Sequence, residues 1–121
     1  QVYRQFGQIR EALVDLNKAI NLNPDLLAAR FNRGAIYYSS EDYQLALEDF
    51  DQCIAIDPHV AGPYFNRAST RQLLGDTVGA KSDLNRFIQL SESEQWKSTA
   101  QDLLQRWEKD EAAKILEAPK S

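Results

Sequence analysis

Cysteine and histidine, two residue types that often carry chemistry, occur once each in this sequence of 121 residues, as Cys53 and His59. Zinc sites take three or four such ligands, so these two residues cannot build one. A reactive thiol needs positive neighbours that lower its pKa, and no basic cluster surrounds Cys53 in the sequence. We interpret Cys53 as a core thiol and His59, which follows Pro58, as a solvated loop residue.

The glycines and carboxylates do not form a catalytic motif either. Gly75 and Gly79 are too few for a loop that cradles phosphate, and their segment fits a turn between helices. Asp15, Asp49 and Asp83 recur every 34 residues, and a residue that appears once per repeat is more often structural than catalytic. We therefore expect no enzyme, no cofactor and no metal.

The spacing of 34 residues extends along most of the sequence. Phe31-Asn32-Arg33 recurs as Phe65-Asn66-Arg67, and Pro24 recurs as Pro58. A fixed period of this length predicts one supersecondary unit stacked on copies of itself, so that neighbouring units bury each other's apolar faces.

Within each unit the apolar residues recur at spacings of three and four, which predicts two helices. The middle unit is expected to form helices over 27–39 and 43–56, and Pro58 follows the end of the second. The next unit is expected to begin near Ala61 and to turn at Gly75 and Asp76. Gly75 suits a left-handed position at a helix end, and Pro63 suits a helix start.

The last part of the sequence departs from the repeat. The segment Ser91 to Glu94 fits a capping box, in which the Ser hydroxyl and the Glu carboxylate satisfy free N–H groups at a helix start. A helix over 93–117 should then cover the apolar face of the last unit, with Trp96, Leu103 and Trp107 as its seam. The alternative is a helix that binds a partner. We expect residues 118–121 to be frayed.

These units resemble the tetratricopeptide repeat. Gly34, Tyr37, Ala46, Phe50 and Pro58 stand at the characteristic positions of the middle unit. The resemblance implies an all-α, right-handed superhelix of stacked antiparallel helix pairs with a C-terminal capping helix. Its repeats would span 1–26 (a partial first repeat), 27–60 and 61–92, followed by the cap over 93–117.

The resemblance also implies a function, because the first helices of such repeats line a concave groove. We expect a protein-interaction module, acting as scaffold or adaptor, that binds a peptide or helix of another protein there. The residues placed in the groove by the family pattern are Phe31, Asn32, Ala35, Tyr38, Phe65, Asn66, Ser69 and Gln72. The alternative for Phe31 and Phe65 is that both belong to the core and only the Asn pair is exposed.

One binding mode of the family is not expected. In co-chaperones that hold the acidic tail of a heat-shock chaperone, Lys, Asn and Arg side chains clamp the terminal carboxylate. Asn32 matches the Asn of this clamp, but Gly62 and Asn66 stand where Lys and Arg should be. We therefore predict a ligand held by neutral hydrogen bonds and aromatic contacts.

Arg33 and Arg67 on the first helices, and Asp49 and Asp83 on the second, recur together. We hypothesise that they pair and help to set the packing of the helices. Independent solvated charges are the alternative.

Composition limits the choice of partner. The net charge of −4 argues against nucleic acid and anionic membranes, which need basic patches, and no run of about 18 apolar residues predicts a membrane span. A single Cys is compatible with a reducing compartment such as the cytoplasm. Because the sequence starts without Met or a signal-peptide pattern, we expect it to begin inside a longer protein. An architectural segment of a longer solenoid, or self-association through the clipped first repeat, is the alternative function.

Overall fold

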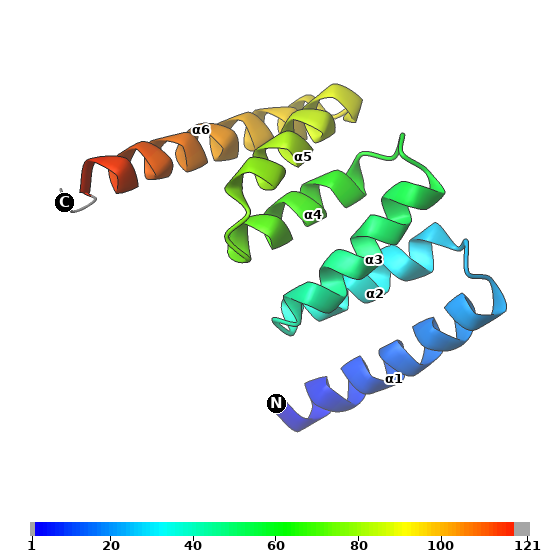
Figure 1. The fold of residues 1–121 in the computed structure, drawn as a ribbon. Helices are drawn as coiled ribbons and strands as arrows, with labels where there is room; N and C mark the ends of the chain where they lie inside the picture. The colour runs from blue at the N-terminus through cyan, green and yellow to red at the C-terminus, as the bar shows by residue number, and fades with distance from the viewer. Residues whose placement is uncertain (1, 118–121) are drawn as a thin grey trace.

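Six helices and the connections between them make up the computed structural model, which describes residues 2–117 and has no strand in that range. They are α1 (Val2–Leu22), α2 (Leu27–Ser39), α3 (Tyr43–Ile56), α4 (Gly62–Leu73), α5 (Thr77–Leu90) and α6 (Glu94–Glu117). The helices stack in chain order (Figure 1), each on its neighbours in the chain, and α2 also contacts α4. The result is an all-α solenoid in which α2 and α4 share one face. The tail expected at 118–121 lies outside the described residues.

Turns of similar shape connect the two helices of each pair. Gly75, between α4 and α5, has a φ of +89°, which confirms the left-handed position predicted for it. Glu41 stands at the same place between α2 and α3 with a φ of +65°. A left-handed backbone costs a residue with a side chain roughly 1–2 kcal/mol. The middle unit therefore tolerates at Glu41 a strain that the next unit avoids.

Small residues let the paired helices approach closely. A Cβ atom built on Gly34 would lie 2.8 Å from Cε1 of Phe50, so a glycine is needed where α2 crosses α3. Ala46 and Phe50 are fully buried at this crossing. In the next pair Ala68 and Leu84 hold the corresponding places and are also fully buried. Each crossing thus combines a small residue on the first helix with a larger one on the second.

A hydrophobic cluster joins α4, α5 and α6. Its buried members are Tyr64, Ala68, Ala80, Leu84, Phe87, Ala100 and Trp107. At the start of α6, the N–H of Trp96 donates to the hydroxyl of Ser93 at 3.2 Å, while Ser91 Oγ accepts from the N–H of Ser93. The capping residue is therefore Ser93 and not Ser91, because the helix begins two residues later than a box starting at Ser91 requires.

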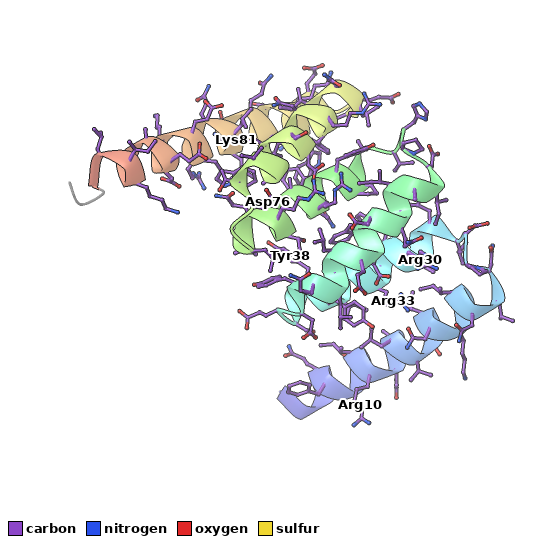
Figure 2. All side chains as sticks on the ribbon, viewed as in Figure 1. Arg10, Arg30, Arg33, Tyr38, Asp76 and Lys81 are labelled. Carbon is purple, nitrogen blue, oxygen red and sulfur yellow. The ribbon has the colours of Figure 1, made fainter. Side chains whose placement is uncertain are left out.

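The far end of α6 extends past this cluster (Figure 1), where Ile115 and Leu116 are 75% and 86% exposed. One ion pair, between Lys81 of α5 (labelled in Figure 2) and Glu111, ties that half of α6 to the stack. The rest of α6 is held by apolar contacts around Trp107.

Candidate interaction groove

Three hollows lie side by side along the first helices of the stack. One, between α2 and the start of α4, is lined by Leu27, Ala28, Phe31, Asn32, Val60, Gly62 and Pro63. Another, further along α2 and α4, is lined by Ala35, Tyr38, Ser39, Phe65, Asn66 and Ser69. The third, between α4 and the start of α6, is lined by Gly62, Phe65, Asn66, Phe87, Ser91 and Trp96. Since neighbouring hollows share Gly62, or Phe65 and Asn66, we call the three together the groove.

The structure brings together all but one of the residues that the sequence places in the groove. Phe31, Asn32, Ala35, Tyr38, Phe65, Asn66 and Ser69 all line it. Gln72 does not. Its Oε1 atom is buried and has no hydrogen-bond partner in the described part of the chain. Gln72 follows Ser69 by nearly one helical turn on α4, and the hollows end before it.

Phe31 and Phe65 are both half-buried, so they are neither wholly core residues nor wholly exposed in the groove. The Phe31 ring packs on Phe50 with centroids 5.9 Å apart, and Phe65 meets Phe87 edge to face at 5.0 Å. Edge-to-face and tilted pairs of this kind stabilise the rings in place. Each Phe thus joins the core on one side and lines the groove on the other.

Two side-chain amides alternate with these rings. Asn32 is exposed and Asn66 is half-buried, one on each first helix. Among the hydrogen bonds of the described residues, none uses either side-chain amide; the hydroxyl of Thr70 donates to the backbone carbonyl of Asn66, not to its side chain. A carboxamide offers both donors and an acceptor. The groove therefore presents two amides that can bind an extended backbone.

Trp96 does not belong to the seam where the sequence places it. It is 53% exposed, whereas Trp107, on the same helix, is 7% exposed. Its ring meets Phe65 of α4 edge to face at 5.5 Å, at the third hollow. Trp96 stands in the first turn of α6, so it reaches back over α4 and lines the groove, a place that the sequence did not predict for it. Its distance from the helix start is the signal that could have separated it from Trp107.

The groove is uncharged. None of the residues that line the three hollows carries a charge, although 26% of the residues in the chain are charged. The charges gather elsewhere: a separate hollow over α2 and α3 is lined by Arg30, Arg33, Glu48, Asp49, Asp51 and Gln52. The groove and this charged hollow are therefore distinct surfaces of the stack.

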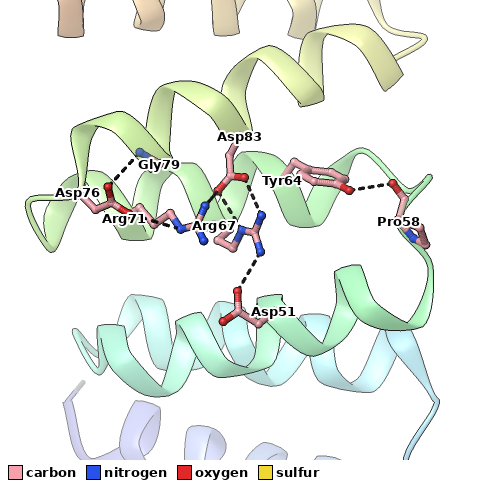
Figure 3. Close-up of polar contacts among 8 residues, drawn as sticks. All are labelled: Asp51, Pro58, Tyr64, Arg67, Arg71, Asp76, Gly79 and Asp83. Carbon is pink, nitrogen blue, oxygen red and sulfur yellow. Dashed lines mark hydrogen bonds and ion pairs between the residues drawn. The ribbon is translucent and has the colours of Figure 1, made fainter.

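The hypothesised arginine–aspartate pairs are present. Arg33 donates to both carboxylate oxygens of Asp49, at 2.8 and 2.6 Å, and Arg67 donates to both of Asp83, at 2.9 and 2.8 Å. Each arginine also reaches the helix before its own: Arg33 donates to Asn17, and Arg67 donates to Asp51 (Figure 3). The pairs thus link three helices at a time.

These pairs are buried at the carboxylate end. The side chains of Asp49 and Asp83 are 3% and 4% exposed. Hydrogen bonds to Asp49 raise the pKa of Arg33. Burial acts to lower the pKa of Arg67, but its bonds to Asp83 and Asp51 outweigh burial and the pKa rises. Both arginines are therefore charged, and each links three consecutive helices.

The remaining reactive groups offer no nucleophile. Cys53 is fully buried, and burial raises its pKa to about 11, so the thiol stays protonated at neutral pH. His59 is exposed in the loop after α3, where its backbone N–H donates to the side chain of Asp57. Within residues 2–117, the His, Cys, Asp and Glu side chains do not gather in threes as a metal site requires. No helix described there has the length and apolarity to cross a membrane.

Family models cover most of the sequence. A model described as a tetratricopeptide repeat matches residues 35–105, more than half of the chain, and one described as a TPR repeat matches residues 1–40. Tetratricopeptide repeat protein 36 of Danio rerio is 43% identical over 74 residues, which cover 61% of this chain and 39% of that protein. The chain spans less than half the length of the curated relatives it matches most strongly.

Solved structures share the fold. The first TPR of Spaghetti (RPAP3), bound to the HSP90 peptide SRMEEVD, superposes with a TM-score of 0.78 at 22% identity, over 91% of this chain and 85% of that one. The translocator chaperone SycD of Yersinia enterocolitica superposes with a TM-score of 0.82 at 16% identity, over 90% of this chain and 78% of that one. At such identities the likeness concerns the fold alone.

Proposed function

Because the chain belongs to the tetratricopeptide repeat family, we propose that it is a protein-interaction module, a scaffold or adaptor that binds a segment of another protein in the groove. One observation carries this proposal: a continuous groove lined by uncharged residues, with unused amides and aromatic rings, lies on a chain in which 26% of the residues are charged. Aromatic rings supply contact area at low entropic cost, and amides fix the register of an extended backbone. Catalysis has no comparable support among the described residues.

The groove chemistry favours a ligand that does not depend on a terminal carboxylate. The RPAP3 domain is bound to an acidic peptide, SRMEEVD. In this chain Gly62 and Asn66 line the groove where a clamp of Lys and Arg would stand. A carboxylate bound there would lose its hydration without gaining an ionic partner. Micromolar binding of SRMEEVD would contradict this prediction.

The proposal is tested with a library of random 12-residue peptides displayed between two folded flanking segments. The wild-type chain and an Asn32→Ala, Asn66→Ala variant are used as bait, and selected peptides are measured by calorimetry. We expect wild type to enrich a peptide family that the variant binds roughly tenfold more weakly, since a backbone bond is lost at each site.

The matched control is Asn21→Ala, Asn85→Ala, which removes two exposed amides outside the groove. It should bind like wild type. If the wild type enriches no peptide, or if both double variants lose affinity equally, the proposed function is wrong.

A second candidate function is an architectural segment that associates with itself or with further repeats. The observation in its favour is on α1, where Phe6 and Val14 are 60% and 51% exposed. Light scattering after size exclusion distinguishes the two: a dimer that Phe6→Ser and Val14→Ser convert to a monomer would support association through α1.

A further inference from the structure

The third hollow of the groove differs from the other two, because a residue from α6 lines it. Phe87 of α5, Phe65 of α4 and Trp96 of α6 form a continuous row, with ring centroids 5.0 and 5.5 Å apart. Each contact is edge to face, which is a favoured arrangement of aromatic pairs. The three rings of this row therefore support one another without a ligand.

We propose that this hollow receives one large apolar side chain of the bound segment, aliphatic or aromatic, and that Trp96 and Phe65 set this preference. This inference rests on the proposed function and specifies its ligand: an uncharged stretch of polypeptide with one bulky apolar residue, recognised away from its chain ends.

The exposure of Trp96 supports this assignment. The ring is anchored by Phe65, yet 53% of the residue is exposed. A large aromatic surface that is rigid and still open to solvent gives much contact area to a ligand at little entropic cost. Aromatic residues of this kind dominate the binding energy of protein interfaces.

The volume of the hollow fits one large side chain. It measures about 240 Å³, and a cavity of roughly 150 Å³ is enough to hold benzene. Gly62, which also lines the hollow, contributes no side chain to it. A polar head would find few partners there, because the Ser91 hydroxyl is buried and already bonded to the N–H and carbonyl of Ser93.

The uncharged lining of this hollow disfavours acidic and basic side chains of a ligand. The residues lining this hollow carry neither a cation for an acidic group nor a carboxylate for Lys or Arg. Burying an unpaired charge costs far more than burying an apolar group of the same size. Asn66, at the rim shared with the next hollow, keeps its amide available for the ligand backbone.

The experiment uses the peptide library described above, in which no peptide has a free carboxyl end. Wild type, Trp96→Ala and Trp96→Phe are selected in parallel, with Ile115→Ala as the control for an exposed apolar residue on the same helix but outside the groove. Thermal unfolding of each variant is measured first. Because Trp96 is half exposed, we expect all four chains to fold.

We expect wild type to enrich Leu, Ile, Met, Phe, Tyr or Trp at one position of its peptides. Trp96→Ala should bind the same synthetic peptides at least tenfold more weakly, Trp96→Phe should recover most of that loss, and Ile115→Ala should match wild type. Replacing the enriched apolar residue of the peptide by Glu or Lys should weaken binding to wild type by a similar factor.

Three outcomes would overturn the inference. In the first, the peptides selected by wild type are dominated by acidic residues. In the second, Trp96→Ala binds these peptides as wild type does, while Asn32→Ala, Asn66→Ala does not; the proposed function then stands, and only the role given to Trp96 is wrong. A wild-type dimer that Trp96→Ala dissociates would make a second copy of the chain the occupant. Failure of wild type to enrich any peptide would instead refute the proposed function itself.

Discussion

Arg33 and Arg67 connect each repeat with the one before it. Both donate to a residue sixteen positions earlier and to one sixteen positions later: Asn17 and Asp49 for Arg33, Asp51 and Asp83 for Arg67. A guanidinium has a planar fork that matches a carboxylate with two bonds and leaves a further N–H for a second partner. A lysine could not make both contacts in this geometry.

Asp83 accepts hydrogen bonds from two arginines, whereas its counterpart Asp49 accepts them from Arg33 and has Arg30 further away, at 3.9 Å. Asp83 accepts from Arg67 and also from Arg71 at 2.9 Å, because Arg71 stands where the middle unit has Tyr37 (Figure 3). In the middle unit the Tyr37 ring lies under Arg33 instead, 5.8 Å from its guanidinium carbon. One buried carboxylate thus balances two arginines in the last repeat.

We therefore expect Asp83→Asn to lower the free energy of unfolding by about 3 kcal/mol. The substitution keeps the size of the side chain but removes the buried carboxylate that the two guanidinium groups share, and leaves them only the exposed carboxylates of Asp51 and Asp76. Losing one partner of a buried pair costs about this much. Urea unfolding followed by circular dichroism measures the change.

The control for this prediction is Asp51→Asn. Asp51 also pairs with Arg67, but its side chain is 48% exposed, and exposed pairs contribute about 0–1 kcal/mol. Equal losses for the two substitutions would show that burial of the carboxylate is not what gives the network its strength.

At the scale of the helix, each pair depends on a match between a small and a large residue. Gly34 faces Phe50 in the middle pair, and Ala68 and Leu84 take these places in the next. The two combinations divide the space at the crossing differently: the pair with the smaller residue on its first helix has the larger one on its second.

This match predicts that Gly34→Ala lowers the free energy of unfolding by about 1–3 kcal/mol, because the new Cβ would overlap the Phe50 ring. Adding Phe50→Leu should recover most of this loss, since the double variant reproduces the combination of the next pair. Thermal and urea unfolding of the single and double variants give the coupling.

Gly7→Ala is the matched control. A Cβ atom on Gly7 would meet no atom within 4 Å, so alanine should stabilise α1 by about 0.4–1 kcal/mol through the entropy of the unfolded chain. If Phe50→Leu fails to offset Gly34→Ala, the two sites are not complementary and the cost lies in the backbone of α2.

Some features of the helices could be predicted from the sequence, and others could not. The ends of α2 and α3 follow from periodicity and from Pro58, and the left-handed Gly75 follows from its place after a helix. The orientation of Trp96 does not, because α6 is not a copy of the repeat and has no second unit to align with. The strained Glu41 could not be predicted either, since a left-handed backbone disfavours any residue with a Cβ atom.

At the scale of the whole molecule, the stack behaves as a one-dimensional array in which each helix contacts mainly its neighbours. Stability in such an array is approximately a sum of local terms, so it differs along the chain. The large hydrophobic cluster joins α4, α5 and α6, whereas Ile20 is the only buried residue among the described side chains of α1. The last repeat should thus be the most stable part and α1 the least.

We predict that hydrogen exchange reveals this gradient. Amides of α1 should exchange at least tenfold faster than those of α4 and α5, because α1 can open without disturbing the cluster. Ile20→Ala should accelerate exchange in α1 and leave α5 unchanged, whereas Trp107→Ala should accelerate exchange in α5 and α6 first, since it removes a buried ring of the cluster. Exchange is followed by mass spectrometry of peptic fragments. The pH is chosen so that each helix closes faster than its open amides exchange, and the rates then report the free energy of opening. Two results would contradict this prediction: equal free energies of opening in all six helices, or an acceleration of exchange in α1 by Trp107→Ala as large as that in α6. Either result would show that the stack unfolds as one unit, and that its stability is not a sum of local contacts between neighbouring helices.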